Sequence, residues 1–279
     1  MEFITGIIAD TCEDVLKIIP FLFITYLFLE WLEQQTEHRF EAVLEKHHRL
    51  APFFGALLGL VPSCGLSGAA GSLFATGVIG TGTLAAVYLS TSDEMLAIMV
   101  SSHASPSVWL PVLAVKFVIA VIAGYLISFL LKSRPVDVDA FCDREHDDHS
   151  HGILYSALMH TFQISGWLLL ITLLLNGLVE LIGMDALQTF VSSHQNASIP
   201  VCALVGMIPS CASSILLSQM YLDGMIPFAS VTAGLLANAG TGMLVLFRVN
   251  PDMKENFRVL GCVWLASLAG GLILALLGL

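Results

Sequence analysis

Gly59-Leu-Val-Pro62-Ser63-Cys64 returns 147 residues later in the chain as Gly206-Met-Ile-Pro209-Ser210-Cys211. At the same offset, residues 53–101 align with residues 200–248 without a gap, and 11 of the 43 positions between Gly55 and Ala97 are identical. Chance matches are common between segments rich in Leu, Ala and Gly, but they do not usually share a Pro-Ser-Cys tripeptide in register. The sequence therefore contains an internal duplication, and each half has about 140 residues.

The composition is that of a membrane protein. Of the 279 residues, 56% are hydrophobic and 12% are charged, and the mean hydropathy is +0.84. A soluble domain is about a quarter charged. Several apolar runs reach the about 20 residues that cross a bilayer, so we expect an all-α, multi-pass protein of the inner or plasma membrane. The first residues lack a basic stretch and a small-residue cleavage site, so no removable signal peptide is expected.

Other classes of protein have little support. The net charge of −11 disfavours nucleic acid as a partner. The six cysteines lie mostly in apolar sequence, unlike the framework of a disulfide-rich secreted domain. The sequence has no Walker-A loop, no Gly-x-Ser-x-Gly and no His-Glu-x-x-His, so neither an ATPase nor an intramembrane hydrolase is indicated, and no cofactor is expected.

Six full crossings and two interrupted segments are predicted. The interrupted segments are Ala51–Ala75 and Pro200–Leu222, because proline breaks a helix at each Pro-Ser-Cys motif. Each arm of about 11 residues would cover roughly half the hydrocarbon thickness, as a broken spanning helix or as a re-entrant hairpin. The expected crossings are Val15–Leu32, Val78–Val100, Val108–Leu131, Leu154–Ile182, Pro227–Phe247 and Val259–Leu279.

The positive charges in the loops distinguish the two models. Lys and Arg in short loops mark the cytoplasmic side. If both interrupted segments are hairpins, Arg39–Arg49, Lys132–Arg144 and Arg248–Arg258 all fall inside. The loops Ser101–Pro106 and Asp185–Ser198, which contain no Lys or Arg, then fall outside. If every apolar segment crosses instead, the halves are parallel and part of this positive charge lies outside.

The hairpin model divides the chain into three parts. Residues 1–131 and 153–279 form two inverted repeats, each with three spanning helices and one Pro-Ser-Cys hairpin, which gives about ten helical segments. Residues 132–152 form a cytoplasmic linker rich in His and Asp. In secondary transporters built from inverted repeats, paired broken helices mark the binding site at the repeat interface.

Three features carry a resemblance to a known family. They are Leu84–Leu96, the paired Pro-Ser-Cys motifs, and Leu235-Leu-Ala-Asn-Ala239. These features resemble the ten-helix family of manganese or heavy-metal exporters, whose members are often labelled arsenic-efflux-like, and the resemblance covers nearly the whole chain. It implies an exporter with ten helices, if each hairpin arm counts as one. The chain departs from the family pattern at Gly240-Thr-Gly242, where the family tends to carry acidic residues.

Asp93 and Glu94 are the foremost candidate ligands. Carboxylates within a spanning segment usually face a cavity, a partner or an ion, and the alternative role is a structural ion pair with Lys116. Adjacent residues of an ideal helix point about 100° apart, so both carboxylates reach one ion only if the helix unwinds, which Ser90-Thr91-Ser92 favours. Two carboxyls side by side cannot both ionise at low cost, so the empty site is expected to hold a proton that a divalent cation displaces.

The tips of the two hairpins supply the second group of candidates, Ser63, Cys64, Ser210 and Cys211. Thiolates prefer soft metals, whereas carboxylate, hydroxyl and carbonyl oxygens suit Mn²⁺. The same four residues are also small enough to let the tips pack closely, as small residues do between membrane helices. Both roles stay open.

Single polar residues add further candidates. Asn238 aligns with Thr91 in the repeat and offers a neutral oxygen to an ion, or else an interhelical hydrogen bond. His103 and His160 lie near the ends of segments, where interfacial anchoring is the main alternative to a functional role. The linker cluster is either a metal-collecting loop or a solvated acidic segment, and its spacing matches no closed zinc site. It comprises Asp143, Glu145, His146, Asp147, Asp148, His149 and His151.

Together these features predict a secondary active transporter that exports a divalent metal cation, Mn²⁺ first, in exchange for protons. Asp93 and Glu94 would bind the ion and the protons, aided by Cys64, Cys211 and Asn238. The partners would then be the metal ion, protons and the lipid bilayer, and a homodimer stays open.

Two alternatives remain. One is efflux of an arsenical or an organic anion, with helix N-termini facing the anion and Lys116 acting as a ligand. The other is an intramembrane enzyme acting on lipid, with Asp93, Glu94 or His103 as general acid or base.

Overall fold

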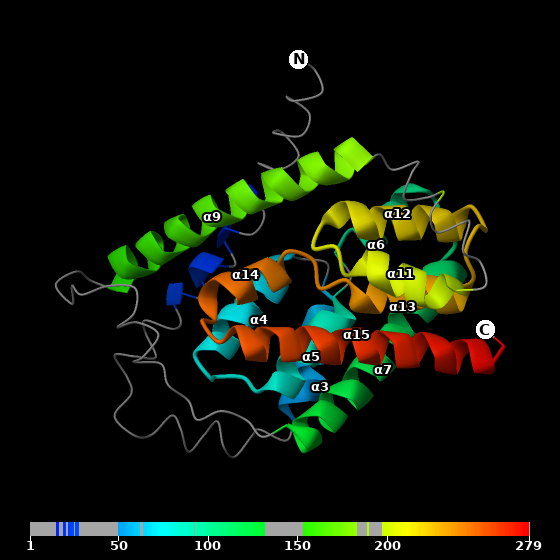
Figure 1. The fold of residues 1–279 in the computed structure, drawn as a ribbon, viewed down its shortest axis with the longest axis horizontal. Helices are drawn as coiled ribbons and strands as arrows, with labels where there is room; N and C mark the ends of the chain where they lie inside the picture. The colour runs from blue at the N-terminus through cyan, green and yellow to red at the C-terminus, as the bar shows by residue number, and fades with distance from the viewer. Residues whose placement is uncertain are drawn as a thin grey trace.

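The protein is built from helices. The computed structural model describes residues 50–61, 64–91, 93–131, 153–182 and 197–278, with residue 189 and scattered positions between 15 and 27, and the regular structure in this part of the chain is helical. The expected all-α fold is thus confirmed. The helices are α3 (Ala51–Gly59), α4 (Cys64–Ala75), α5 (Thr81–Ser90), α6 (Asp93–Ser101), α7 (Pro106–Leu130), α9 (Ile153–Ile182), α11 (Ser198–Gly206), α12 (Cys211–Leu222), α13 (Phe228–Ala237), α14 (Gly242–Val249) and α15 (Met253–Leu276) (Figure 1).

Among the described residues, five stretches of helix are long and apolar enough to cross a membrane: Thr81–Ser101, Pro106–Leu130, Ala157–Leu174, Phe228–Val249 and Met253–Leu276. They match five of the six predicted crossings, and most of the sixth lies outside the described residues. Two of the five are interrupted, because the first consists of α5 and α6 and the fourth of α13 and α14. In the apolar 18-residue stretch of Phe228–Val249, 89% is buried inside the protein, against 33% in the corresponding stretches of α7 and α15. The interrupted spans therefore form the centre of the bundle.

The duplication in the sequence is also a duplication of helices. Shifted by 147 residues, the bounds of α3, α4 and α5 coincide with those of α11, α12 and α13, and α7 and α15 begin at equivalent residues. Gly77 and Gly224, which are identical in the alignment, have φ values of 78° and 70°. Glycine adopts this left-handed conformation without strain, so the same turn is built into both halves.

Helices α11 and α12 form a hairpin. Ser198 Oγ, at the start of α11, lies 2.8 Å from Ser230 Oγ, near the start of α13. At the other end of α11, a Cβ on Gly206 would lie 2.0 Å from the Gly234 carbonyl oxygen. Helices α11 and α13 are therefore parallel neighbours, and α12, which connects them along the chain, has to run in the opposite direction. Figure 1 shows α11 and α12 lying side by side.

The first half has the same hairpin. A Cβ on Gly55 would lie 3.1 Å from the Thr83 carbonyl oxygen, and one on Gly59 would lie 2.6 Å from the Val87 carbonyl oxygen. Helices α3 and α5 are thus also parallel, and α4, which connects them along the chain, runs in the opposite direction. In both halves the helix that precedes the Pro-Ser-Cys motif and the helix that follows it therefore run in opposite directions.

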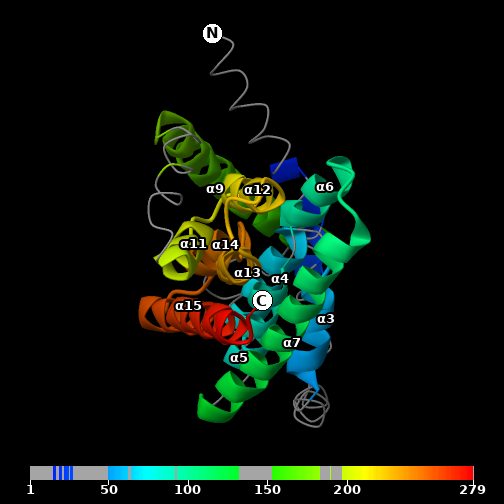
Figure 2. The same ribbon diagram turned by 90° about the vertical axis from the view of Figure 1, so that its right-hand side faces the viewer.

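The two halves interlock reciprocally. The returning arm α4 packs along α14 of the second half, and α12 packs along α6 of the first. Helix α5 likewise touches α15, and α13 touches α7. Each of these contacts thus has its counterpart between the equivalent helices of the other half. Figure 2 shows α13 and α14 in the interior, with α9 and α15 at one edge.

Candidate functional site

Both interrupted spans unwind at equivalent places. Helix α5 ends at Ser90, and Thr91 has φ −51° and ψ 127°. Helix α13 ends at Ala237, and Asn238 has φ −83° and ψ 97°. Unwound backbone at membrane depth is tolerated only where protein buries it or where it lines a cavity. The expected unwinding before Asp93 is thus confirmed.

The break in the second half is joined to the tip of its own hairpin. Asn238 is buried, and its Nδ2 donates to Ser213 Oγ at 3.1 Å. Ser213 Oγ in turn lies 2.8 Å from the Ser210 carbonyl oxygen. The Asn238 Oδ1 accepts the Gly240 N–H at 2.8 Å. The structure therefore shows the interhelical hydrogen bond that was one of the two expected roles of Asn238.

Ser210 and Cys211 lie where the tip turns into α12. Ser210 caps the helix, because its Oγ accepts the Ala212 N–H at 3.3 Å. Cys211 is buried and packs in one apolar cluster with Ile164 of α9 and Val245 of α14. Ser210 is thus linked to the second break through Ser213, and Cys211 belongs to the apolar cluster that includes α9.

The break in the first half carries a buried cation. Lys116 on α7 is only 1% exposed, and its Nζ donates to the Thr91 carbonyl oxygen. The Thr91 hydroxyl donates to the Val87 carbonyl oxygen at 2.7 Å, and Ser90 Oγ lies 2.8 Å from the Ala86 carbonyl oxygen. An ammonium group and two hydroxyl groups therefore cap the C-terminal end of α5. The structure confirms that Lys116 reaches this break, two residues before Asp93.

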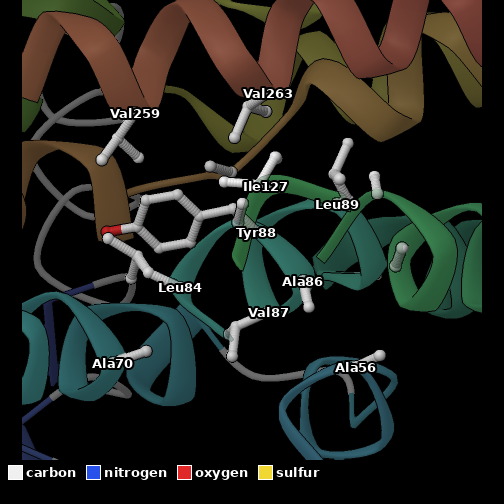
Figure 3. Packing of buried hydrophobic residues seen from close by; sticks show 14 of the residues in the cluster. Ala56, Ala70, Leu84, Ala86, Val87, Tyr88, Leu89, Ile127, Val259 and Val263 are labelled. Carbon is white, nitrogen blue, oxygen red and sulfur yellow. The ribbon is translucent and has the colours of Figure 1, made fainter. Parts of the chain in front are cut away.

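Tyr88 links the two halves, a role that the sequence did not reveal. Its hydroxyl donates to the Gly242 carbonyl oxygen at 2.8 Å, across 154 residues of chain. A Cβ on Gly242 would lie 2.6 Å from Ser67 of α4, so the start of α14 fits directly against α4 and α5. Figure 3 shows the Tyr88 ring between Leu84 and the valines of α15. In the sequence, the only indication that Tyr88 has a special role was its position in Leu84–Leu96, the stretch that carries the resemblance to the exporter family.

The remaining candidates are less fully defined. Asp93 and Glu94 open α6 and Cys64 opens α4, but the side chains of all three lie outside the described residues. His103 is exposed in the turn after α6, with φ 53°. In the described part of the chain, no three His, Cys, Asp or Glu side chains lie close enough to hold a metal ion. Ser63, the side chain of His160, and the linker residues His146, His149 and His151 also lie outside this part.

Two interrupted spans meeting two hairpins inside a bundle of apolar helices define a multi-pass membrane protein. A family model described as "Putative, 10TM heavy-metal exporter" matches residues 2–185 and 129–254, and the chain belongs to this family. The expected family is thus confirmed, and with it a membrane exporter as the general class. The comparison with curated proteins and the comparison with solved structures gave no match.

Proposed function

We propose that this protein is a secondary active transporter that exports a divalent metal cation, Mn²⁺ first, in exchange for protons. The observation that carries the proposal is the break at Thr91 in a buried span, followed at once by Asp93 and Glu94. Discontinuous helices of this kind supply the ion sites of many secondary transporters. Carboxylate, hydroxyl and carbonyl oxygens are ligands suited to Mn²⁺.

The coupling follows from the two adjacent carboxyl groups. In a low-dielectric site they favour sharing a proton when no metal is bound, and a divalent cation favours the ionised pair. Metal binding from the cytoplasm would displace protons, and protonation from outside would release the metal. The Lys116 ammonium group, held at the Thr91 carbonyl two residues before Asp93, would favour the ionised carboxylates as a bound metal does.

The proposal includes two inverted repeats, residues 1–131 and 153–279, joined by linker 132–152. Its support is the direction of the helices. A Cβ on Gly242 would touch Ser67, and one on Gly71 would lie 3.3 Å from the Leu246 nitrogen, so α4 and α14 are parallel. Helix α4 is antiparallel to α5, because it returns from the hairpin. Since α14 is parallel to α4, α14 is also antiparallel to α5. The interrupted spans of the two halves then cross the membrane in opposite directions.

Cysteine labelling tests this topology. In a background without other reactive thiols, single cysteines replace Ser102 and Ser150, and intact cells receive an impermeant maleimide. Inverted repeats with a cytoplasmic linker predict labelling at position 102 and protection at position 150. Labelling at position 150 with none at position 102 would discard the model.

Flux in proteoliposomes tests the transport proposal. Wild-type protein should move Mn²⁺ when a pH gradient is imposed, and Asp93→Asn and Glu94→Gln should each abolish this flux. Asp223→Asn is the matched control, because Asp223 is an exposed carboxylate beyond the end of α12. Equal Mn²⁺ flux in all four proteins would exclude Asp93 and Glu94 from the ion site.

One observation favours a second candidate, efflux of an arsenical or an organic anion. Lys116 is a buried cation beside a helix break, and the N-termini of α6, α12 and α14 offer partial positive charge to an anion. If the substrate is an arsenical or an organic anion, Lys116→Met should abolish its flux. Under the metal proposal, Lys116→Met changes the pH dependence of metal binding and leaves the site in place.

A further inference from the structure

The two breaks have the same geometry but different chemistry. At the offset of 147 residues, Thr91 corresponds to Asn238, Asp93 and Glu94 to Gly240 and Thr241, and Lys116 to Val263. The first break therefore has a fixed cation and two carboxylates in its sequence, and the second has none of these charges. Because the helices of the two halves have equivalent bounds, the two breaks can be compared residue by residue. The comparison identifies the hydrogen-bond donors that the second break lacks.

At the first break, hydrogen-bond donors cap the C-terminal end of α5. The Thr91 N–H bonds to the Val87 carbonyl oxygen at 3.0 Å, and the Lys116 ammonium group bonds to the carbonyl oxygen of Thr91 itself. The last carbonyl groups of a helix have no partner within the helix and need such donors. The ammonium group of Lys116 is thus a monovalent cation that is bound by a carbonyl oxygen of the unwound backbone.

At the second break, the equivalent donors are missing. In the part of the chain that the structure describes, the Asn238 N–H makes no capping bond to α13, and no backbone N–H donates to the Asn238 carbonyl oxygen. Val263, in the place of Lys116, is fully buried and apolar. The negative end of α13 is therefore left uncapped in the interior of the protein.

Thr241 adds an unpartnered oxygen at the same break. Its side chain is only 1% exposed, and its Oγ1 has no hydrogen-bond partner in the structure. It does not cap α14, because Thr241 itself is in helical conformation, with φ −69° and ψ −14°. Leaving a buried hydroxyl group without a partner is unfavourable, so an occupant that binds this oxygen would be favoured.

We propose that the break between α13 and α14 binds a monovalent cation, Na⁺ in the first instance, in the position that the Lys116 ammonium group occupies at the equivalent break. The Asn238 carbonyl oxygen, other carbonyl groups at the end of α13 and Thr241 Oγ1 are its ligands. Carbonyl groups at the C-terminal ends of half-helices coordinate Na⁺ in this way in secondary transporters. The cation would secure the second break as Lys116 secures the first.

The ligand set selects for a single charge. Every candidate oxygen at this break is neutral, whereas tightly held divalent cations have carboxylate ligands. The two helix ends at a break carry opposite partial charges of about half an elementary charge each, so the empty site is close to neutral. A monovalent cation also loses less hydration energy on burial than a divalent one. The site is thus separate from the carboxylate site at the first break.

Sodium binding by the purified full-length protein tests this inference. Binding of ²²Na⁺ and thermal stability are measured during titration with NaCl at constant ionic strength, with choline as the replacement cation and no divalent metal present. Thr241→Val keeps the shape of the side chain and removes the oxygen, and it should weaken Na⁺ binding at least tenfold. The matched control is Thr232→Val, which removes another fully buried, unpartnered hydroxyl group from the middle of α13. Its Na⁺ affinity should equal that of the wild type.

A second variant places a cation at the break covalently. Val263→Lys should abolish Na⁺ binding, because its ammonium group would take the position of the ion. Absence of saturable Na⁺ binding by the wild type would overturn the proposal and leave water as the occupant, and so would equal weakening in both threonine variants. Repeating the titration with Asp93→Asn/Glu94→Gln separates this site from the proposed metal site. Sodium binding that persists there, whatever the outcome for metal transport, supports the proposal, and its loss would refute a separate site.

Discussion

The packing of the second hairpin against the broken span predicts a large effect for the substitution Gly206→Ala. The added Cβ would lie 2.0 Å from the Gly234 carbonyl oxygen and 2.8 Å from its carbonyl carbon. Contacts shorter than 3.0 Å are essentially never seen for a real Cβ, so α11 and α13 would have to separate by at least 1.0 Å. Both partners are main-chain atoms, so no side chain can rotate out of the way.

The expected cost follows from two opposing terms. Overpacking of a well-packed interior costs about 1–3 kcal/mol, and a clash with backbone belongs at the upper end. Replacement of glycine by alanine within a helix recovers about 1 kcal/mol. The free energy of unfolding should therefore fall by about 2 kcal/mol, as measured by titrating detergent-purified protein with SDS and following tryptophan fluorescence.

A matched variant isolates the packing term. Gly261 lies in α15 with nothing within 4 Å of its would-be Cβ, so Gly261→Ala should leave the protein as stable as the wild type or stabilise it by up to about 1 kcal/mol. In the first half, Gly59→Ala should resemble Gly206→Ala, because its Cβ would lie 2.6 Å from the Val87 carbonyl oxygen. Equal stability of Gly206→Ala and Gly261→Ala would refute the close approach of α11 to α13 at Gly206.

Three further substitutions test single features of the site, by the same titration. Tyr88→Phe should lower the free energy of unfolding by about 1 kcal/mol, because the buried Gly242 carbonyl oxygen loses its donor, and unchanged stability would contradict the link between the halves. Asn238→Ala should cost about 1–3 kcal/mol, because it breaks the bond to Ser213. Its effect should shrink in a background that carries Ser213→Ala, and simple additivity would argue against this bond. Gly224→Ala should cost about 1–2 kcal/mol from its φ of 70° alone, because nothing lies within 4 Å of the added Cβ. A stability equal to that of the wild type would show that this turn is not needed.

Much of the fold could be predicted from the repeat. The offset of 147 residues located the helices of the second half, and the Pro-Ser-Cys motifs located both hairpins. The polar stretch at Ser90-Thr91-Ser92 indicated the break before Asp93. These features depend on local preferences and on apolar run length, which the sequence carries directly.

The partners across the site could not be predicted in the same way. The sequence shows that Lys116 and Tyr88 lie in apolar helices, but the carbonyl groups they bind are on other elements, at Thr91 and Gly242. Backbone carbonyl groups carry no residue-type signal. The packing of α4 along α14 also depends on how the two halves meet, which the sequence alone does not show.

Proton release on addition of Mn²⁺ to weakly buffered, purified protein tests the exporter proposal most directly. If Asp93 and Glu94 share a proton that the metal displaces, the wild type should release protons as it binds Mn²⁺, and the binding should weaken as the pH falls. The double variant Asp93→Asn/Glu94→Gln should neither bind Mn²⁺ nor release protons, while Asp223→Asn should match the wild type. Proton release that persists undiminished in the double variant would contradict the assignment of these carboxylates as the coupling site.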